Sequence, residues 1–311
     1  MESFLVAVNA VVPFLCYITF GYVMKIKGVV KEDFLQQLNK MVFKVFYPFM
    51  TFYNIYKADA SSLPRPVMLI FCGISILVLE VILVLTVPRL VKENPRRGVI
   101  IQAIYRSNFV LFGLPLTVSV FGDVASSVAA MVVTVVITIY NTTSVVILEM
   151  FNSEGKTDVK TILVNVVKNP LLQGAMVGLV FFFLGIHVPK SLLTPIAAFA
   201  DATSPVALLG GTLHFNAIRG NLKYLVPALS LKLLVLPAVM LALGYAFGLR
   251  DLELFLLVAI YGTPVAAASY PMAQNMGGDG ELAGQFVVIS TVVAVGTLFG
   301  WIFFMKSVGL I

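Results

Sequence analysis

Charged residues are scarce in this chain. Only 12% of its 311 residues are Asp, Glu, Lys or Arg, whereas 59% are hydrophobic, and the mean hydropathy is +0.99. Soluble domains carry about 25% charged residues, so this composition excludes a soluble globular protein. A membrane-spanning helix needs about 20 apolar residues. The sequence therefore predicts a polytopic membrane protein with little room for a soluble domain.

Residues typical of catalytic or metal sites are also few. The two cysteines, Cys16 and Cys72, both lie in apolar segments, which favours core packing over a disulfide, a metal site or a thiol enzyme. The sequence contains no phosphate-binding glycine loop, no HExxH, no Gly-x-Ser-x-Gly and no pair of intramembrane aspartates. We therefore expect no enzyme, no metal and no resident cofactor.

The net charge of +6 needs no nucleic-acid partner, because membrane proteins concentrate Lys and Arg in cytoplasmic loops. Here the basic residues gather in the odd-numbered connections between apolar segments. The positive-inside rule then places both termini outside the cytoplasm. The N-terminus lacks the basic n-region of a signal peptide, so the first apolar segment is expected to be a retained helix in the cell membrane.

Ten apolar segments define the predicted all-α fold. They cover residues 4–24, 34–56, 66–90, 98–121, 125–150, 170–187, 192–214, 222–248, 252–276 and 281–305. Residues 159–168 alternate apolar runs with Lys160 and Lys168 at helical spacing, which is typical of an interfacial helix.

The two halves of the chain carry proline, glycine and other helix-disfavouring residues at equivalent positions. At an offset of 156 positions, Asn108 corresponds to Pro264, Pro115 to Pro271, and Asp123 to Asp279. At an offset of 157 positions, Pro13 corresponds to Pro170, Gly21 to Gly178, and Pro48 to Pro205. The repeated unit has five helices, and an odd number inverts the second copy. We expect a first repeat at 1–151, a cytoplasmic loop with the interfacial helix at 152–169, and an inverted repeat at 170–311.

The fourth and ninth segments carry helix-disfavouring residues at matching points. Helix breaks are predicted at Asn108, Pro115, Pro264 and Pro271. Broken membrane helices at equivalent points of two repeats are the best sequence pointer to a transporter binding site. The alternative is a pair of proline kinks that serve only packing.

Each predicted break has a physical cause. Pro264 lacks an N–H group and blocks the carbonyl four residues earlier, while Gly113 and Gly262 allow unusual backbone geometry. Half-helices beginning near Gly113 and Ala266 would direct the positive ends of their dipoles toward the membrane midplane, which favours an anion there. The predicted substrate-binding residues are Arg106, Ser107, Asn108, Phe109, Gly113, Gly262, Thr263, Pro264, Val265 and Ala266.

Ionisable groups at membrane depth require a partner or a function, because inserting one costs at least about 2.5–3.5 kcal/mol. Arg106 is expected either to bind an anionic substrate or to form an ion pair with Glu80. Asp201 could carry a coupling proton or cation, or neutralise Lys232 or Lys40. The candidates for support or for coupling to Na⁺ or H⁺ are Lys40, Asp201, Glu80, Thr134, Asn141 and Ser290.

Two of these assignments have ordinary alternatives. Lys40 begins the second segment on the cytoplasmic side, where a lysine can extend its ammonium into the interface. Thr134, Asn141 and Ser290 could supply oxygen ligands to Na⁺. Helical Ser and Thr more often bond backbone carbonyls.

Several stretches resemble the auxin efflux carrier family of plants and bacteria, over essentially the whole chain. The most specific are Asn39-Lys40 with Pro48, Ser107-Asn108 with Gly113-Leu114-Pro115, and Pro264 with Ser269-Tyr270 and the run 277–283. The resemblance implies ten helices in two inverted repeats, with helices four and nine broken and crossing at the substrate site. It also implies a scaffold from helices 1, 2, 6 and 7, which could form a homodimer, and a transport domain from helices 3–5 and 8–10 that moves like an elevator.

The same resemblance implies a secondary active transporter of small organic anions, such as malate, malonate or auxin-like acids. Asn108 matches the Asn that contacts the substrate carboxylate in plant members, and Lys40 matches a supporting lysine. Arg106 and the short central loop depart from the plant pattern, which favours a dicarboxylate and a bacterial inner membrane. A membrane receptor or sensor that retains the transporter fold is the alternative, and a channel is a second one.

Overall fold

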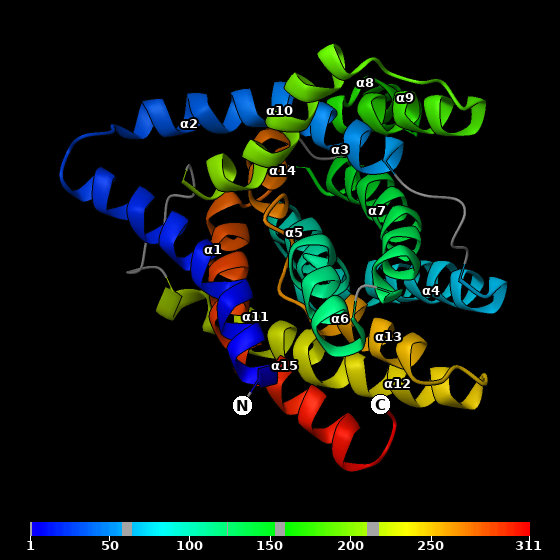
Figure 1. The fold of residues 1–311 in the computed structure, drawn as a ribbon. Coiled ribbons are helices and arrows are strands. Elements are labelled where there is room, and N and C mark those ends of the chain that lie inside the picture. The colour runs from blue at the N-terminus through cyan, green and yellow to red at the C-terminus, as the bar shows by residue number, and fades with distance from the viewer. Residues whose placement is uncertain (1, 58–63, 123, 153–158, 210–217) are drawn as a thin grey trace.

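The computed structural model describes residues 2–57, 64–122, 124–152, 159–209 and 218–311. Within these residues, the regular structure is helical apart from one isolated antiparallel bridge between Ser107 and Val265. This confirms the predicted all-α class. Helices α5 and α6 lie near the centre of the molecule, with other helices around them (Figure 1).

The elements of the first half reach from α1 to α7. They are α1 Glu2–Ile26, α2 Glu32–Met41, the π-helix η1 Val42–Phe46, α3 Tyr47–Tyr56, α4 Pro66–Leu90, α5 Asn94–Tyr105, the π-helix η2 Phe109–Gly113, α6 Leu114–Phe121 and α7 Val124–Met150. Two of the predicted segments are thus runs of consecutive helices rather than single helices.

The elements of the second half begin with the short helix α8. Its elements are α8 Val159–Lys168, α9 Pro170–Leu184, α10 Lys190–Leu209, α11 Ile218–Ser230, the π-helix η4 Leu231–Val235, α12 Leu236–Ala246, α13 Leu252–Gly262, α14 Ser269–Asn275 and α15 Gly280–Ser307. The end of the predicted segment 192–214 and residue Asp123 lie outside the described residues.

Length and apolar composition identify fewer membrane-spanning helices than the ten predicted segments. Of the described residues, five helices pass that test: Pro66–Leu90, Met131–Met150, Lys190–Leu209, Ile218–Ala246 and Gly280–Ser307; a sixth span results if the bent pair Ile162–Lys168 and Pro170–Leu184 is counted as one. The two members of that pair meet at 62°. The apolar stretches Leu15–Ile26, Phe109–Phe121 and Leu252–Gly262 of the described residues are shorter than such a span, so the ten-span arrangement stays a prediction.

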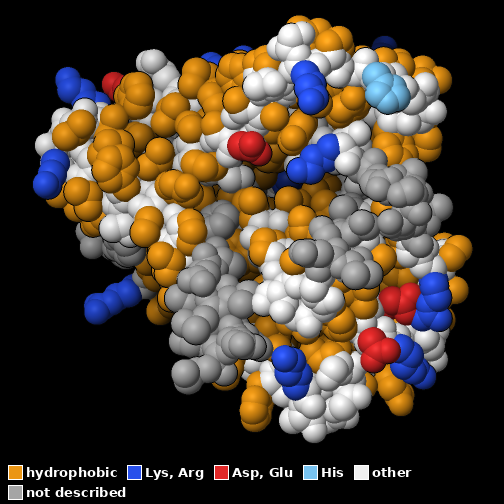
Figure 2. Space-filling model, viewed as in Figure 1, with side chains coloured by type: hydrophobic (Ala, Val, Ile, Leu, Met, Phe, Trp, Pro, Cys, Tyr) orange, Lys and Arg blue, Asp and Glu red, His pale blue; other side chains and the backbone are white. Residues whose placement is uncertain are grey.

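Lipid-compatible surface covers the outer helices. On α4, Ile70, Ile74 and Val81 are more than half exposed, whereas Ile76 and Leu79 of the same helix are buried. Hydrophobic side chains dominate the visible face, with few charged groups between them (Figure 2). Contiguous apolar surface of this extent marks a contact surface in a soluble protein, and here it matches the lipid bilayer that the composition predicts as the solvent.

Helices α3 and α9 pack closely at one end of the molecule, beside α8 and α10 (Figure 1). Gly174 of α9 permits this approach: a Cβ added there would lie 2.7 Å from the Pro48 Cα. Gly178, one turn later, faces Phe52 and Ile55 in the same way. The absence of side chains at these two positions allows the helix backbones to come together, as small residues do in membrane proteins.

The Gly278-Asp279 motif caps the last helix. Asp279 accepts a hydrogen bond from the Leu282 N–H at 3.0 Å, and Arg96 donates to its other carboxylate oxygen, also at 3.0 Å. The Asp279 N–H donates to the Pro95 carbonyl. The motif therefore anchors the start of α15 to the start of α5. This structural role accounts for the Gly278-Asp279 motif without a bound ligand.

The cysteines differ in environment. Both are free; Cys72 is buried, as expected for core packing, whereas Cys16 is exposed on α1. The packing prediction for Cys16 is therefore wrong, because α1 turns that side chain away from the protein core.

Candidate functional site

The two predicted helix interruptions meet in space. Helix α5 ends at Tyr105 and α13 ends at Gly262, and the segments that follow pair through the bridge between Ser107 and Val265. The Asn108 N–H donates to the Pro264 carbonyl at 2.8 Å. Backbone freed from helical hydrogen bonding is thereby satisfied by the other half of the chain, as irregular backbone inside a membrane protein requires.

Two of the predicted breaks need correction. Pro115 lies in the first turn of α6 and Pro271 lies within α14, so neither interrupts a helix. The interruptions are at 106–108 and 263–268. The first four N–H groups of a helix have no intrahelical partner, so a proline is tolerated in that turn. Pro271 therefore lies in the first turn of its half-helix, and Pro115 lies where the π-helix η2 continues into α6.

The starts of the half-helices also shift. The first begins at Phe109, as the π-helix η2, and the second at Ser269, whereas Gly113 and Ala266 were expected. Gly113 instead accommodates a ring, since a Cβ there would overlap the Phe109 side chain. π-Helical turns occur often at functional sites, and η2 follows Asn108 directly.

Arg106 is a buried cation at the end of α5. Its side chain is 3% exposed. One guanidinium nitrogen donates to Asn141 Oδ1 at 2.8 Å, and another donates to Met272 Sδ at 2.6 Å. The expected ion pair with Glu80 is wrong, because Glu80 accepts a hydrogen bond from the Thr143 hydroxyl at 2.6 Å instead. Among the described residues, the hydrogen bonds of Arg106 thus go to neutral groups, and none of the ion pairs found there includes it.

A cavity of about 370 Å³ opens beside this cation. Predicted site residues that line it are Arg106, Ser107, Asn108, Phe109, Ala266, Asn141 and Asp201. Those that are not among its lining residues are Gly113, Gly262, Thr263, Pro264, Val265, Lys40, Glu80, Thr134 and Ser290. The first interruption therefore faces the cavity more fully than the second does.

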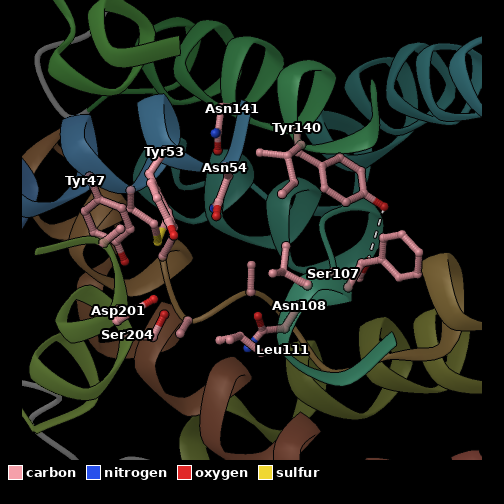
Figure 3. Close-up of a pocket in the computed structure, with 18 of the residues that line it drawn as sticks. Tyr47, Tyr53, Asn54, Ser107, Asn108, Leu111, Tyr140, Asn141, Asp201 and Ser204 are labelled. Carbon is pink, nitrogen blue, oxygen red and sulfur yellow. Dashed lines mark hydrogen bonds between the residues drawn. The ribbon is translucent and has the colours of Figure 1, made fainter. Parts of the chain in front are cut away.

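The lining also contains residues that the sequence analysis missed. They are chiefly Tyr47, Met50, Tyr53 and Asn54 of α3, Lys57 directly after that helix, Tyr140 of α7, and Ser204 of α10. The α3 residues recur at spacings of three to four, which places them on one face of the helix. That polar and aromatic stripe in an otherwise apolar segment was a detectable signal. Figure 3 shows Asn54 and Asn141 directed toward the space above Asn108, with Asp201 and Ser204 together on another wall.

Hydrogen bonds order two walls of the cavity. The Ser107 hydroxyl lies 3.4 Å from the Tyr140 hydroxyl, which links the first interruption to α7 (Figure 3). Charged lining residues are Lys57, Arg106 and Asp201. Because Asp201 can offset only one of the two cations, the lining has a formal excess of positive charge.

Ser290 supports the second interruption from behind. Its hydroxyl accepts a hydrogen bond from the Val265 N–H at 3.0 Å and donates to the Val287 carbonyl at 3.0 Å. The bonds give Ser290 a structural role in holding the crossing segment. Thr134 is buried outside the cavity, and its carbonyl accepts from the Thr138 hydroxyl at 2.8 Å, which agrees with backbone bonding of helical hydroxyls.

Replacing Ser290 by Ala is expected to destabilise the protein by about 1–3 kcal/mol, because the buried Val265 N–H loses its acceptor. The measurement is the melting temperature of the purified protein in detergent. Ser307→Ala is the matched control, since the Ser307 hydroxyl only bonds the Phe304 carbonyl at an exposed position. Equal melting temperatures for the two variants would contradict the support role of Ser290.

Of the Asn39-Lys40 pair, the asparagine faces inward. Asn39 is 1% exposed, and its Nδ2 donates to the Tyr270 hydroxyl at 3.2 Å. Lys40, in the last turn of α2, is exposed and is not among the cavity residues. The structure therefore does not bring Lys40 to the site. The Asn39 hydrogen bond instead joins α2 to the first turn of α14.

Asn39→Leu is expected to lower transport at least about 5-fold, because it breaks a buried hydrogen bond worth about 1 kcal/mol and leaves the Tyr270 hydroxyl without that partner. Lys40→Leu, the neighbouring control, is expected to change transport less than about 2-fold, since exposed charges contribute little. Initial rates in proteoliposomes compare the two. A larger loss in Lys40→Leu would restore lysine to the site.

Comparison with known proteins decides the family. The profile of the family described as "Membrane transport protein" matches residues 6–302. The chain belongs to that family. It is the auxin efflux carrier family that the sequence motifs indicate, and the chain is accordingly a multi-pass membrane protein of a transporter family.

Two archaeal relatives are similar over nearly their whole length. An uncharacterized transporter of Methanothermobacter thermautotrophicus is 23% identical over 302 residues, covering 96% of this chain and 98% of the relative. An uncharacterized transporter of Methanocaldococcus jannaschii is 24% identical over 312 residues, covering 96% and 99%. Both are named as transporters, which agrees with a transport protein rather than an enzyme.

Proposed function

We propose that this protein of the membrane transport protein family is a secondary active transporter of small organic anions, which bind in the cavity beside Arg106. The observation that carries the proposal is the buried guanidinium, which lines the cavity and, among the described residues, donates hydrogen bonds to the neutral groups of Asn141 and Met272. A buried charge is normally paired. An anionic substrate would supply the missing charge.

The start of the half-helix at Phe109 supports an anion at the same point. Phe109, Val110 and Leu111 line the cavity, and the apolar helix Phe109–Phe121 begins there. The first N–H groups of a helix lack intrahelical partners and carry the positive end of its dipole. Arg106, the Asn108 amide and these N–H groups therefore form one set of donors.

The size of the cavity fits a small substrate. At about 370 Å³ it is near the lower end of the range of about 300–1,000 Å³ for ligand sites. A planar guanidinium can bind a carboxylate through two parallel hydrogen bonds, and Asn54 and Asn141 can donate to a second carboxylate across the space. A dicarboxylate such as malate or malonate is the substrate class we propose.

The transport cycle in this proposal uses the two repeats. Ten helices would form two inverted five-helix units, as inverted repeats do in other secondary transporters. The first, second, sixth and seventh helices would act as the scaffold, and the others would carry the site across the membrane. Support comes from the cavity itself, because its walls come from both sets: α3 and α10 on one side, and the interruption at 106–108 with α7 on the other.

Counterflow of radiolabelled malate or malonate in proteoliposomes tests this function. Wild type is expected to show saturable exchange, and Asn108→Ala is expected to lose at least about 10-fold in apparent affinity, because one donor to the carboxylate is removed. Asn152→Ala, at the end of α7 and outside the cavity, is the control. Binding of either acid without flux would support a receptor instead. The absence of both binding and flux would overturn the proposed substrate class.

A further inference from the structure

Lys232 is a second buried cation, outside the cavity. It lies in the π-helix η4, in the middle of the apolar run Ile218–Ala246, and is 0% exposed. Its Nζ donates to the Ile104 carbonyl at 3.5 Å. Ile104 is in the last turn of α5, two residues before Arg106. The ammonium therefore adjoins the negative end of the same half-helix whose continuation forms the binding site.

No carboxylate compensates Lys232 among the described residues, because the ion pairs found there join other groups. The elements packed against η4 are α5, α11, α12, α13 and α15. Most of their titratable groups have other partners: Arg96 with Asp279, Arg97 with Asn94, Tyr105 with Ser144, Lys223 with the Tyr224 ring, Tyr224 with Glu93, Tyr245 with Arg250, Glu253 with Arg65, Tyr261 with Ser75, and Glu281 with Gln285. The other two, Arg219 and Lys306, are exposed.

The local backbone is built to hold this side chain. Four residues after Leu233, Pro237 has no N–H group to donate to the Leu233 carbonyl, and the Trp301 indole N–H donates to it instead at 2.9 Å. π-Helical turns inside helices occur often at functional sites. Maintaining a buried lysine in an apolar helix without a counter-ion disfavours its charged form, so the lysine is retained against a stability cost that a leucine would avoid.

We propose that Lys232 takes up a proton when the organic anion binds, so that anion transport is coupled to protons. The inference rests on the proposed function. With the cavity empty, a charged Lys232 would add to the charge of Arg106, and the neutral amine is favoured. A bound dianion, acting through the intervening turn of α5, favours the charged form of Lys232 instead. A proton from the aqueous phase then forms an N–H bond at Nζ, and it is released when the anion leaves on the other side.

Accumulation of labelled malate in proteoliposomes under an imposed pH gradient tests this coupling, with the membrane potential clamped at zero. For one proton per anion, an inward gradient of one pH unit is expected to concentrate the label about tenfold in wild type. Lys232→Met and Lys232→Gln are expected to exchange malate at reduced rates and to show no accumulation. Lys223→Met, an exposed lysine of the neighbouring α11, should accumulate label like wild type.

Three outcomes would overturn the inference while leaving the proposed function intact. These are wild-type exchange without accumulation, accumulation retained in Lys232→Met, and loss of accumulation in Glu80→Gln alone, since Glu80 is a buried carboxylate of the described residues that could carry the proton. No exchange by wild type is instead a failure of the proposed function. If both Lys232 variants fail to fold, proton uptake on adding malate to weakly buffered wild type decides: about one proton per bound anion supports the inference, and none contradicts it.

Discussion

Replacing Arg106 by Gln is expected to weaken malate or malonate binding by about 30-fold or more, because removing one partner of a buried, hydrogen-bonded charge pair costs at least about 2 kcal/mol. Gln keeps a hydrogen-bond donor of similar reach to Asn141 but removes the charge. The loss is measured as the apparent affinity for exchange in proteoliposomes, and as the dissociation constant of the purified protein by calorimetry.

Two further variants isolate the cause of that loss. Arg106→Lys retains the charge but not the planar two-pronged donor, so it is expected to lie between wild type and Arg106→Gln. Arg89→Gln removes an exposed arginine whose Nη1 bonds only the Leu85 carbonyl, and binding should change less than about 2-fold. An Arg106→Gln protein that folds and binds both acids like wild type would show that this cation is structural.

Gly174→Ala is expected to have a large effect on stability outside the site, at the contact between α3 and α9. The new methyl group would lie 2.5 Å from the Thr51 hydroxyl oxygen and 2.7 Å from the Pro48 Cα, and the helix backbone cannot move aside locally. Overpacking of this kind costs about 1–3 kcal/mol. A melting temperature lower by about 2–4 °C per kcal/mol is expected in detergent.

Gly296→Ala supplies the control for that measurement, since a Cβ at Gly296 of α15 meets nothing within 4 Å. Its melting temperature should match or exceed that of wild type, because Ala is the better helix former. If Gly174→Ala were as stable as Gly296→Ala, then α3 and α9 would not be in the close contact described here.

The sequence predicted the all-α class and the approximate positions of the two interruptions, whereas the ten-span arrangement stays a prediction. The apolar segments are long, and helix-breaking residues mark both points where the backbone leaves the helix. The exact breaking residue was harder to predict. Asn108 and Pro264 lie in the interruptions, whereas Pro115 and Pro271 lie in the helices that follow, because a proline fits the first turn of a helix as well as it ends the preceding one.

The composition of the cavity was only half predictable. The motif around Asn108 identified one wall, since its residues are consecutive in the sequence. The wall from α3, including Tyr47 and Asn54, comes from a helix far away in the chain, and only tertiary packing brings it there. The sequence left open whether Arg106 binds substrate or pairs with Glu80 for the same reason: Glu80 and Asn141 both lie on neighbouring helices, and sequence spacing cannot tell which side chain faces the guanidinium.

The central claim is that an organic dianion binds between Arg106 and Asn108, and anomalous scattering locates such an anion directly. Crystals of the purified protein with 2-bromosuccinate, collected at the bromine absorption edge, are predicted to give a peak inside the cavity lined by Arg106, Asn108 and Asn141. Arg106→Gln crystals should lack it. A peak elsewhere in the molecule, with exchange of the same acid intact in proteoliposomes, would contradict the assignment of this cavity as the transport site.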